Sequence, residues 1–414
     1  MSPNPAAPPG APDGASDTAP LRWLLALAAV EIATMLSFMN YSAALPIIRA
    51  TWSLSASQAG TIFAGQQIGY TLAVLVLSSL TDRIGVRRIY LASAALNGLG
   101  GLLFAFWARD FWTAIAARAV IGAGLAGTYV PGMRLVVERT PTARRGAAMG
   151  IYISCFSIGS AASLALTGAL LPTGLQTAFA VTALGPLVAA AVAGPLLAEP
   201  LRVAGGPPPT PVRAVLRNTR AMRFILAYAA HNWELFGMRT WMPAFLAVAW
   251  QAAGRPLRDA AVLGATVSGA MLLASAASNA SGGWLSDRLG RSRTIRVFLI
   301  GSAGCSFALG WVLPWGIPIV LGVALLYGIL VTADSSTIST AVAESAEPGA
   351  LGRTLAVQSS LGFIVTAISP ALFGLILDVT AQWGWAFASL GLAALLGVLA
   401  TPVRDSRRPS PSIQ

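Results

Sequence analysis

The sequence predicts an all-α membrane protein with twelve transmembrane helices in two six-helix, pseudo-symmetric halves. Hydrophobic residues make up 56% of the 414 residues and charged residues only 10%, against roughly 25% charged residues in soluble domains. Apolar stretches recur at lengths of roughly 20 residues, the number of helical residues that spans a hydrocarbon core. One charged loop motif also occurs twice, half a chain apart. Lipid is therefore the expected solvent for most of the chain.

Apolar stretches bounded by Arg, Asp, Pro or Gly define the expected helices in chain order. The first six cover 22–48, 56–80, 88–108, 111–136, 146–171 and 176–198. The second six cover 221–249, 258–282, 294–312, 317–341, 354–377 and 383–402. Between them lies EPLRVAGGPPPTPVRAVLRNTR, which is too rich in Pro and Arg to span lipid and is predicted to be a cytoplasmic linker. The predicted organisation is an N-terminal tail (1–20), a first half (21–198), the linker (199–220), a second half (221–403) and a C-terminal tail (404–414).

Arginine sets the expected orientation, because cytoplasmic loops of membrane proteins carry an excess of basic residues. Twenty arginines fall on the side of the linker and the tails, and four fall on the other side. Both termini are therefore expected in the cytoplasm, in a multi-pass protein of the cytoplasmic (inner) membrane. Residues 1–20 lack the basic-then-apolar order of a cleaved signal and are expected to form a disordered tail.

Several classes of function are disfavoured by composition. The net charge of +12 comes from arginines that lie in small groups between apolar spans, so a nucleic-acid partner is not expected. A single histidine and scattered carboxylates do not form a metal-ligand set, and no nucleotide-binding loop or catalytic spacing is present, so neither a cofactor nor an enzymatic activity is expected. Cys155 and Cys305 both lie in apolar spans and are expected to be small buried side chains.

Two loops of the chain repeat each other. SSLTDRIGVRR (78–88) follows the second expected helix and GWLSDRLGRSR (283–293) follows the eighth, which places Asp82 and Asp287 205 residues apart. A weaker echo pairs ERTPTARRG (138–146) with ESAEPGALGRT (344–354). Repeats at half the chain length are typical of transporters in which two parallel halves enclose a site near the midplane of the bilayer.

These motifs resemble the major facilitator superfamily, whose signature is a G-x-L-x-D-R-x-G-R/K-R/K loop after the second helix and, less strictly, after the eighth. Gly283 to Gly290 fit it closely, whereas the first copy has Ser78 for the leading glycine and Val86 for a basic residue. The family's fourth-helix motif, an Arg followed four residues later by Gly, is matched by Arg118 and Gly122. The resemblance covers all twelve expected helices and implies a secondary transporter; we expect it to be a monomer.

The resemblance also implies roles for the repeated loops. Asp82 would face the start of the eleventh helix near Arg353, and Asp287 would face the start of the fifth helix near Arg145; these contacts would hold the outward-open state. The alternative is that both aspartates only cap and orient a solvated loop. The residues expected to control gating are Asp82, Arg83, Gly85, Arg88, Asp287, Arg288, Gly290, Arg291, Arg145 and Arg353.

Polar residues inside the expected spans are the candidate functional residues, since an ionisable group at mid-membrane costs roughly 2.5–3.5 kcal/mol unless it has a partner, water or a function. They fall in the first, fourth, seventh and tenth helices, which line the central cavity in the family that the chain resembles. Counting ~1.5 Å per residue predicts a cationic layer towards the periplasm and an acidic layer towards the cytoplasm. The first contains Arg118, Arg239 and Asn40, and the second contains Glu31, His231 and Asp334, with Glu234 near the middle.

The predicted function is secondary active transport of a small anionic solute by alternating access, coupled to protons. Arg239 is the expected main anchor, because a guanidinium stays charged and offers forked donors to an oxyanion. Glu234 lies five positions from Arg239, about 140° around an ideal helix, so the two are poorly placed to pair. The segment HNWELFGMRTWMPAFL also resembles the seventh helix of cyanate- and nitrate-type anion permeases. The expected substrate-binding residues are Arg239, Arg118, Asn40, Asn232, His231 and Tyr41.

Protons are expected to be carried by Glu31, Glu234 and Asp334, because a carboxylate that is buried takes up a proton more readily than one in water. An alternative for Arg239 is a structural ion pair with Glu31 or Asp334. In the second helix, Gln66, Gln67 and Tyr70 are better suited to helix packing than to substrate binding. The expected partners are a small-molecule substrate, protons and the lipid bilayer.

The sequence leaves two other functions open. One is a proton-driven exporter of cationic or neutral drugs, in which the buried acids hold the substrate. The fifth helix, GIYISCFSIGSAASLALTG, disfavours it because it lacks the G-x-x-x-G-P-x-x-G-G run of drug exporters in that family. The other is a membrane sensor that keeps the fold without transport, since fold does not fix function.

Overall fold

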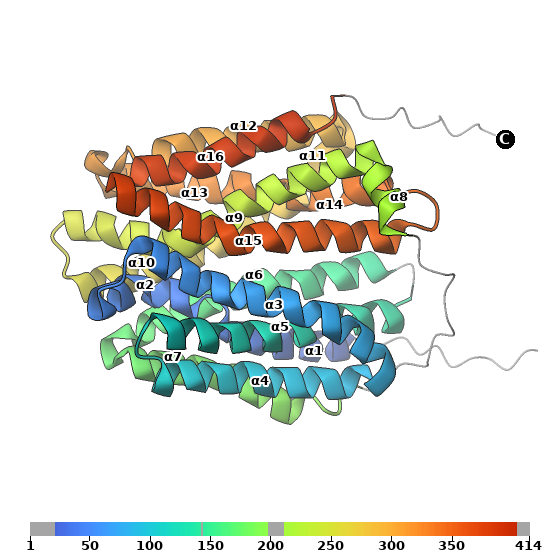
Figure 1. Ribbon diagram of the computed structural model, residues 1–414, viewed down its shortest axis with the longest axis horizontal. Coiled ribbons are helices and arrows are strands. Elements are labelled where there is room, and N and C mark those ends of the chain that lie inside the picture. The colour runs from blue at the N-terminus through green and yellow to red at the C-terminus, as the bar shows by residue number, and fades with distance from the viewer. Residues whose placement is uncertain (1–20, 142–143, 198–210, 404–414) are drawn as a thin grey trace, which may run out of the picture.

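The computed structural model describes residues 21–141, 144–197 and 211–403, and every regular element within these ranges is a helix (Figure 1). The predicted tails at 1–20 and 404–414 and the part of the predicted linker at 199–210 lie outside the described residues. Long helices run side by side along the molecule, with the first half of the chain, in blue to green, packed against the second half, in yellow-green to red. The predicted fold class of an all-α membrane protein with twelve spans in two halves is confirmed.

The bounds of the helices follow the predicted spans closely. The first half contains α1 (Leu21–Thr34), η1 (Met35–Ser37), α2 (Asn40–Trp52), α3 (Ala56–Ile84), α4 (Val86–Trp107), α5 (Phe111–Arg139), α6 (Arg145–Leu170), η3 (Leu171–Thr173) and α7 (Leu175–Val192). The second half contains α9 (Thr219–Ala252), α10 (Leu257–Ala276), α11 (Ser278–Leu289), α12 (Arg291–Leu309), η4 (Leu313–Trp315), α13 (Ile317–Ala333), α14 (Ser335–Glu344), α15 (Leu351–Thr380) and α16 (Trp383–Ala400). The short helix α8 (Val212–Arg217) falls within the predicted linker.

Local sequence accounts for where several helices begin and end. Ser55 caps α3 in a capping box with Gln58, and Asp110 caps α5 through the backbone N–H groups of its first turn. The repeated loops each turn on a glycine, Gly85 with φ 91° and Gly290 with φ 88°, a backbone conformation that favours glycine. The sequence repeat is therefore also a repeat of backbone shape.

Three of the predicted spans differ from continuous helices. The first is interrupted between Thr34 and Asn40, the eighth at Ala277 and the tenth at Asp334. Ten helical segments in the described part of the chain are long and apolar enough to cross a membrane, and α9 and α12, which carry more polar residues, complete the twelve. A break inside a span frees backbone carbonyls that need new donors, so each break marks a place where side chains must supply them.

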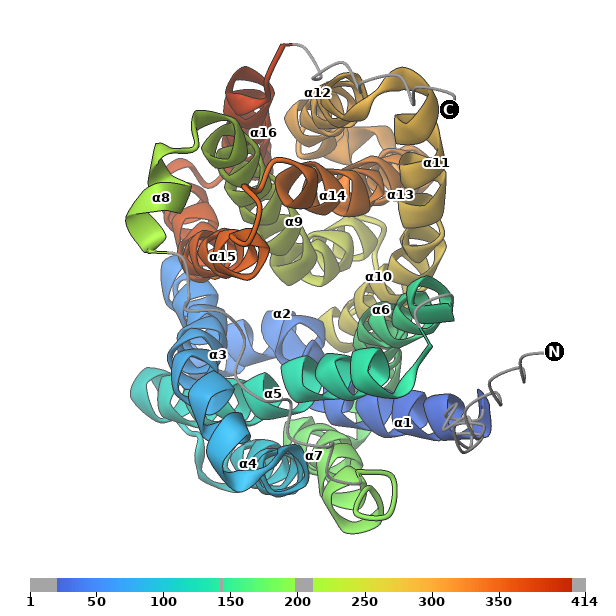
Figure 2. The same cartoon turned by 90° about the vertical axis from the view of Figure 1, so that its right-hand side faces the viewer.

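The two halves meet along two helix pairs, α3 with α15 and α6 with α10, while α2 packs on α9 and α10. Figure 2 looks onto the end of the molecule that carries α8, with α3 beside α15 on one side and α6 beside α10 on the other. We call this the linker end, and the end that carries Trp52 and the start of α10 the opposite end. Near the opposite end α3 and α15 are in backbone contact, because Gly60 lies against the carbonyl of Pro370 and Gly374 against the backbone of Ala56.

Candidate functional site

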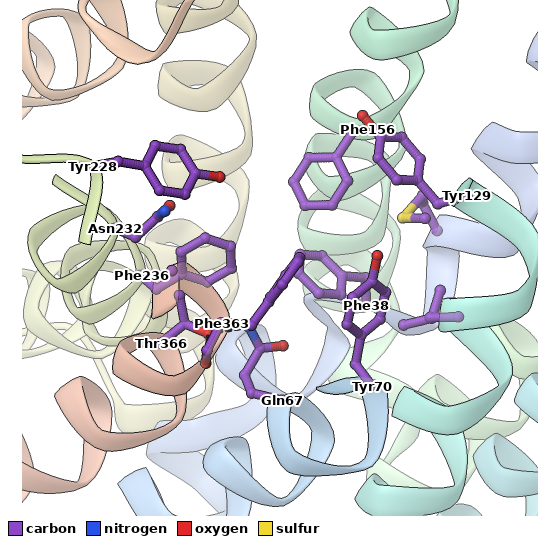
Figure 3. A pocket seen from close by; sticks show the side chains of 13 residues that line it. Phe38, Gln67, Tyr70, Tyr129, Phe156, Tyr228, Asn232, Phe236, Phe363 and Thr366 are labelled. Atoms are coloured by element: carbon purple, nitrogen blue, oxygen red, sulfur yellow. Dashed lines mark hydrogen bonds between the residues drawn. The ribbon is translucent and has the colours of Figure 1, made fainter. Parts of the chain in front are cut away.

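A cavity of about 170 Å³ lies between the two halves (Figure 3), and its lining residues on α3, α5, α6 and α15 come from the interior of those helices rather than from their ends. Seven of the 13 residues that line it are aromatic, and none is charged. They come from η1 and its flank, α3, α5 and α6 in the first half and from α9 and α15 in the second. The labelled lining residues are Phe38, Gln67, Tyr70, Tyr129, Phe156, Tyr228, Asn232, Phe236, Phe363 and Thr366. We call it the central cavity.

Aromatic contacts and one hydrogen bond connect the halves around the central cavity. The ring centroids of Tyr70 and Phe363 are 4.6 Å apart, and Gln67 Nε2 donates to Thr366 Oγ1 at 2.9 Å; each pair joins α3 to α15. On the other wall, Phe156 lies 5.0 Å from Phe38, centroid to centroid. The cavity therefore depends on both halves, and a movement of one half against the other changes its shape.

Sequence reasoning found only part of this cavity. Of the residues expected to bind substrate, Asn232 lines it, whereas Gln67 and Tyr70, which were expected to serve helix packing, also lie on its wall. The aromatic residues were not predicted, because a phenylalanine or tyrosine in an apolar span has the same appearance whether it faces lipid, protein or a cavity. Gly362, which also lines the cavity, could not be recognised as a lining residue from the sequence either. A Cβ at Gly362 would lie 2.5 Å from Tyr228 Cε1 and 2.9 Å from Asn232 Nδ2, so glycine leaves room for two lining side chains.

Arg239 faces a second, smaller cavity of about 30 Å³ between the halves. Its lining is rich in methionine, with Met39 from the first half and Met238, Met242 and Met271 from the second. Arg239 is largely buried, its Nε has no hydrogen-bond partner, and no carboxylate in the described part of the chain pairs with it. The ion pair considered for it with Glu31 or Asp334 is not formed, since both acids contact other side chains.

Arg118 supplies hydrogen-bond donors to the backbone at the break in the first span. Its guanidinium donates to the backbone carbonyls of Ser37 at 3.3 Å and Phe38 at 3.1 Å and to Asn40 Oδ1 at 2.9 Å, and it lies 5.4 Å from the centre of the Tyr41 ring. The residue is fully buried. In this conformation the two terminal nitrogens of Arg118 are bonded to Asn40 and to the broken helix, while its Nε is buried without a partner. Arg118, Asn40 and Tyr41 all lie outside the lining of the central cavity.

Two buried carboxylates occupy corresponding places in the two halves. Glu31 Oε2 accepts hydrogen bonds from Tyr90 at 2.9 Å and Tyr152 at 3.0 Å, and Glu234 Oε2 accepts one from Ser302 at 2.9 Å. In both carboxylates the other oxygen, Oε1, is buried without a partner. They lie 203 residues apart, close to the 205 residues that separate the repeated loops, so the pseudo-symmetry relates them. An unpartnered buried carboxylate oxygen is a place where a proton can reside.

His231 and Asp334 form a buried pair beside the break in the tenth span. His231 Nδ1 lies 2.9 Å from Asp334 Oδ1, and His231 Nε2 lies 2.9 Å from Ser335 Oγ. Both partners are 1% exposed. His231 was expected to bind substrate, but the structure places it with Asp334, outside the lining of the central cavity.

The repeated loops lie at the linker end. Asp287 Oδ1 accepts from Arg291 at 2.7 Å, and Arg291 also pairs with Glu344 at 3.1 Å; charge-assisted bonds to the two carboxylates raise the pKa of Arg291. Arg145 Nε instead donates to the carbonyl of Thr140 at 3.0 Å, so the structure does not bring Asp287 to Arg145.

The remaining gating residues lie in the same loops or at the start of α15. Arg83 and Arg88 are exposed on either side of Gly85, Arg288 stacks on Trp284 at 3.8 Å, and Arg353 lies in the first turn of α15. The side chain of Asp82 lies outside the described residues, so its contact with Arg353 stays a prediction.

Asp378 is a residue that sequence reasoning missed. It lies in the last turn of α15 at the opposite end, where its two carboxylate oxygens accept from the backbone N–H groups of Ala56 and Ser57, each at 2.7 Å. These groups begin α3, so one acid of the second half caps a helix of the first. The signal was available in the sequence, because an acid in the last turn of a helix opposes the helix dipole unless it serves a neighbour.

Comparison with known proteins identifies the family. A sequence profile described as Major Facilitator Superfamily matches residues 27–333 and 257–414. The chain belongs to the major facilitator superfamily. It is thus a multi-pass membrane transporter rather than an enzyme, as predicted, and the resemblance of its repeated loops to the superfamily's signature is confirmed.

Similar proteins within the superfamily include a probable sulfoacetate transporter of Cupriavidus necator, 24% identical over 88% of this chain and 90% of the relative. A gentisate transporter of Corynebacterium glutamicum is 24% identical over 85% of this chain and 80% of the relative. Among solved structures, a bacterial homologue of the human lysosomal transporter Spinster, in an inward-facing and unoccupied conformation, superposes with a TM-score of 0.72 over 92% of this chain and 94% of that one, at 16% identity. This structural likeness concerns the fold alone.

Proposed function

We propose that this chain is a secondary transporter that moves a small organic anion across the cytoplasmic membrane by alternating access, with protons as the coupling ion. Arg239 carries the proposal. A guanidinium stays charged at any physiological pH, and burying a charge without a partner is costly. Arg239 lies between the halves with no acid beside it in the described residues, so an anion that visits the site would supply the missing partner.

Similar proteins support an anionic substrate. The two curated relatives are named for sulfoacetate and gentisate, and both compounds are organic anions. The drug-exporter alternative needs acids that hold a cationic substrate. Glu31, Glu234 and Asp334 all lie outside the lining of the central cavity. Each contacts a side chain of a different helix: Tyr90 for Glu31, Ser302 for Glu234 and His231 for Asp334. Their placement favours proton carriage over substrate binding.

Alternating access is supported by the asymmetry of the two ends. At the opposite end, Asp378 and the Gly60 and Gly374 contacts join α3 to α15. At the linker end, Asp287 and Arg145 are not joined. With the linker end in the cytoplasm, as the distribution of arginine predicts, this conformation is inward-facing, which is also the conformation named for the similar Spinster homologue.

Flux in proteoliposomes tests the proposal. Purified protein is reconstituted, and uptake of radiolabelled sulfoacetate and gentisate is measured with and without a proton gradient, in wild type, Arg239→Lys, Arg239→Ala and the exposed control Arg255→Ala. Arg239→Ala removes at least one charge-assisted hydrogen bond, worth roughly 1.5–3 kcal/mol, so apparent affinity should fall roughly 10- to 100-fold. Arg239→Lys keeps the positive charge but loses the two parallel donors of the guanidinium, so its apparent affinity should lie between those of wild type and Arg239→Ala.

Three results would reject the proposal. The first is an anion affinity in Arg239→Ala that equals that of Arg255→Ala. The second is a screen of anions and cations in which only cations are transported, which would favour drug export. The third is binding of a solute without any flux, which would favour a sensor.

A further inference from the structure

We infer that the central cavity accepts a single aromatic ring, so that the substrate is an aromatic carboxylate or a close analogue rather than a short aliphatic acid. This inference rests on the proposed function, because it specifies which organic anion the site takes. It starts from the shape and chemistry of the cavity lining.

Volume limits the occupant. The central cavity measures about 170 Å³. A cavity of roughly 150 Å³ lined by apolar side chains is known to hold one benzene molecule in another protein. The central cavity thus has room for one six-membered ring with a small substituent, and two fused or linked rings exceed it.

The walls favour a flat ring over a chain of the same size. Phe38 and Phe156 form one wall and Tyr228 and Phe236 lie on the opposite side, so both faces of an occupant meet aromatic rings (Figure 3). Aromatic pairs prefer stacked or edge-to-face contacts with centroids 4.5–7 Å apart and gain affinity beyond the area they bury. A saturated ring or an alkyl chain has no π-system, so its affinity comes only from the apolar area that it buries.

Polar groups on the same walls suit the substituents of such a ring. The hydroxyl group of Tyr228 points into the cavity from α9 in the second half (Figure 3), and Tyr70 on α3 adds a second phenol to the lining from the first half. Asn232 adds an amide, and the lining contains no charged residue that would repel or trap an ion. Phenol and amide groups donate to hydroxyl and carboxylate oxygens alike.

The guanidinium of Arg239, outside the central cavity, is the proposed partner for the carboxylate charge of the substrate. Arg239 follows Phe236 by three residues on α9, slightly less than one helical turn and about 4.5 Å along the axis, towards the opposite end. Phe236 lines the central cavity and Arg239 lines the small methionine-rich cavity. The two cavities share no lining residue, so the neighbouring positions of Phe236 and Arg239 on α9 are the link between them. In the inferred pose, a ring between Phe156 and Tyr228 has its carboxylate on the side of the cavity that is nearer to Arg239.

The test compares two probes with the same carbon skeleton and carboxylate, of which one is aromatic and the other saturated. Binding of benzoate and of cyclohexanecarboxylate to the full-length protein in detergent is measured by calorimetry in wild type, Phe156→Leu and the control Phe106→Leu, whose residue is 53% exposed on the outer face of α4. Wild type should bind benzoate roughly 2- to 12-fold more tightly per aromatic contact. Phe156→Leu should reduce this preference, and Phe106→Leu should retain it.

The outcomes separate the two proposals. Equal affinity for both probes in wild type, or a preference that Phe156→Leu leaves unchanged, overturns the inference about the ring while the anion proposal stands. If benzoate does not bind to wild type, the inference about the ring is overturned, and the anion proposal is decided by the flux measurements. If Arg239→Ala binds benzoate as tightly as wild type, the anion proposal fails and the inference fails with it.

Discussion

Asp378 holds the two halves together at the opposite end, and its removal should shift the protein towards the outward-facing state. In Asp378→Asn the side chain keeps its shape but loses its charge and one of its acceptor oxygens. The affected bonds run to the backbone N–H groups of Ala56 and Ser57 at 2.7 Å. Because they cross from α15 to α3, they exist only while this end is closed.

The magnitude follows from these two bonds. Hydrogen bonds to a charged group contribute roughly 1.5–3 kcal/mol each, or roughly 3–6 kcal/mol for the pair. Asparagine still accepts one bond, and Asp378 is exposed to solvent, which screens its charge, so we expect a loss of about 1–2 kcal/mol. That corresponds to a change of about 5- to 30-fold in the ratio of outward- to inward-facing molecules.

Distances between spin labels across the opposite end measure this ratio. Labels at Thr177→Cys and Gln251→Cys, both exposed and one in each half, are placed in a background without Cys155 and Cys305. Asp378→Asn should add a population with a longer distance. The matched control is Asp110→Asn, because Asp110 also caps two backbone N–H groups, at 2.9 Å, but does so within the first half. If Asp378→Asn and Asp110→Asn give the same distance distribution as wild type, the bonds of Asp378 do not set the conformational balance.

Two further predictions concern coupling and the shape of the central cavity. Glu234→Gln should abolish uphill, pH-driven uptake in proteoliposomes while leaving counterflow exchange largely intact, because glutamine can keep the bond to Ser302 but has no carboxyl group that takes up and releases a proton. A normal pH dependence in both Glu234→Gln and Glu31→Gln would argue against coupling through these acids. Gly362→Ala should lower substrate affinity about tenfold, because a Cβ there would lie 2.5 Å from Tyr228 Cε1, whereas Gly352→Ala on the same helix meets nothing within 4 Å and should bind as wild type does.

Much of the fold could be predicted because lipid imposes a strong rule on sequence. Each span must be apolar for roughly 20 residues, and each polar loop must lie outside the hydrocarbon core. The number and order of the helices can therefore be predicted from the hydropathy of the sequence. The repeated loops have the same backbone conformation at Gly85 and Gly290, as the similarity of their two sequences predicts. The breaks at Met35–Ser37 and Asp334 were not predicted, since hydropathy is the same for a straight and a broken apolar helix.

The candidate site could be predicted only where a residue is out of place in lipid. Glu31, Arg118, Glu234 and Arg239 were singled out for this reason, and all four are wholly or largely buried. Their partners were not predictable. Arg118 and Arg239 were expected to act together on one anion, yet the first is occupied by the backbone carbonyls beside Asn40 and the second has no partner in the described residues.

The class of this protein can be read from its amino-acid sequence, which is enough to predict the spans, the two halves, the repeated loops and the short list of buried charges. All of these follow from the cost of placing polar groups in lipid, which acts on each residue separately. Tertiary structure alone decided that aromatic residues from both halves meet in the central cavity, that Arg239 is left unpaired and that Asp378 caps a helix more than 300 residues away. These features depend on which helix faces come together, and in an apolar span the faces that meet protein, lipid or a cavity are chemically alike.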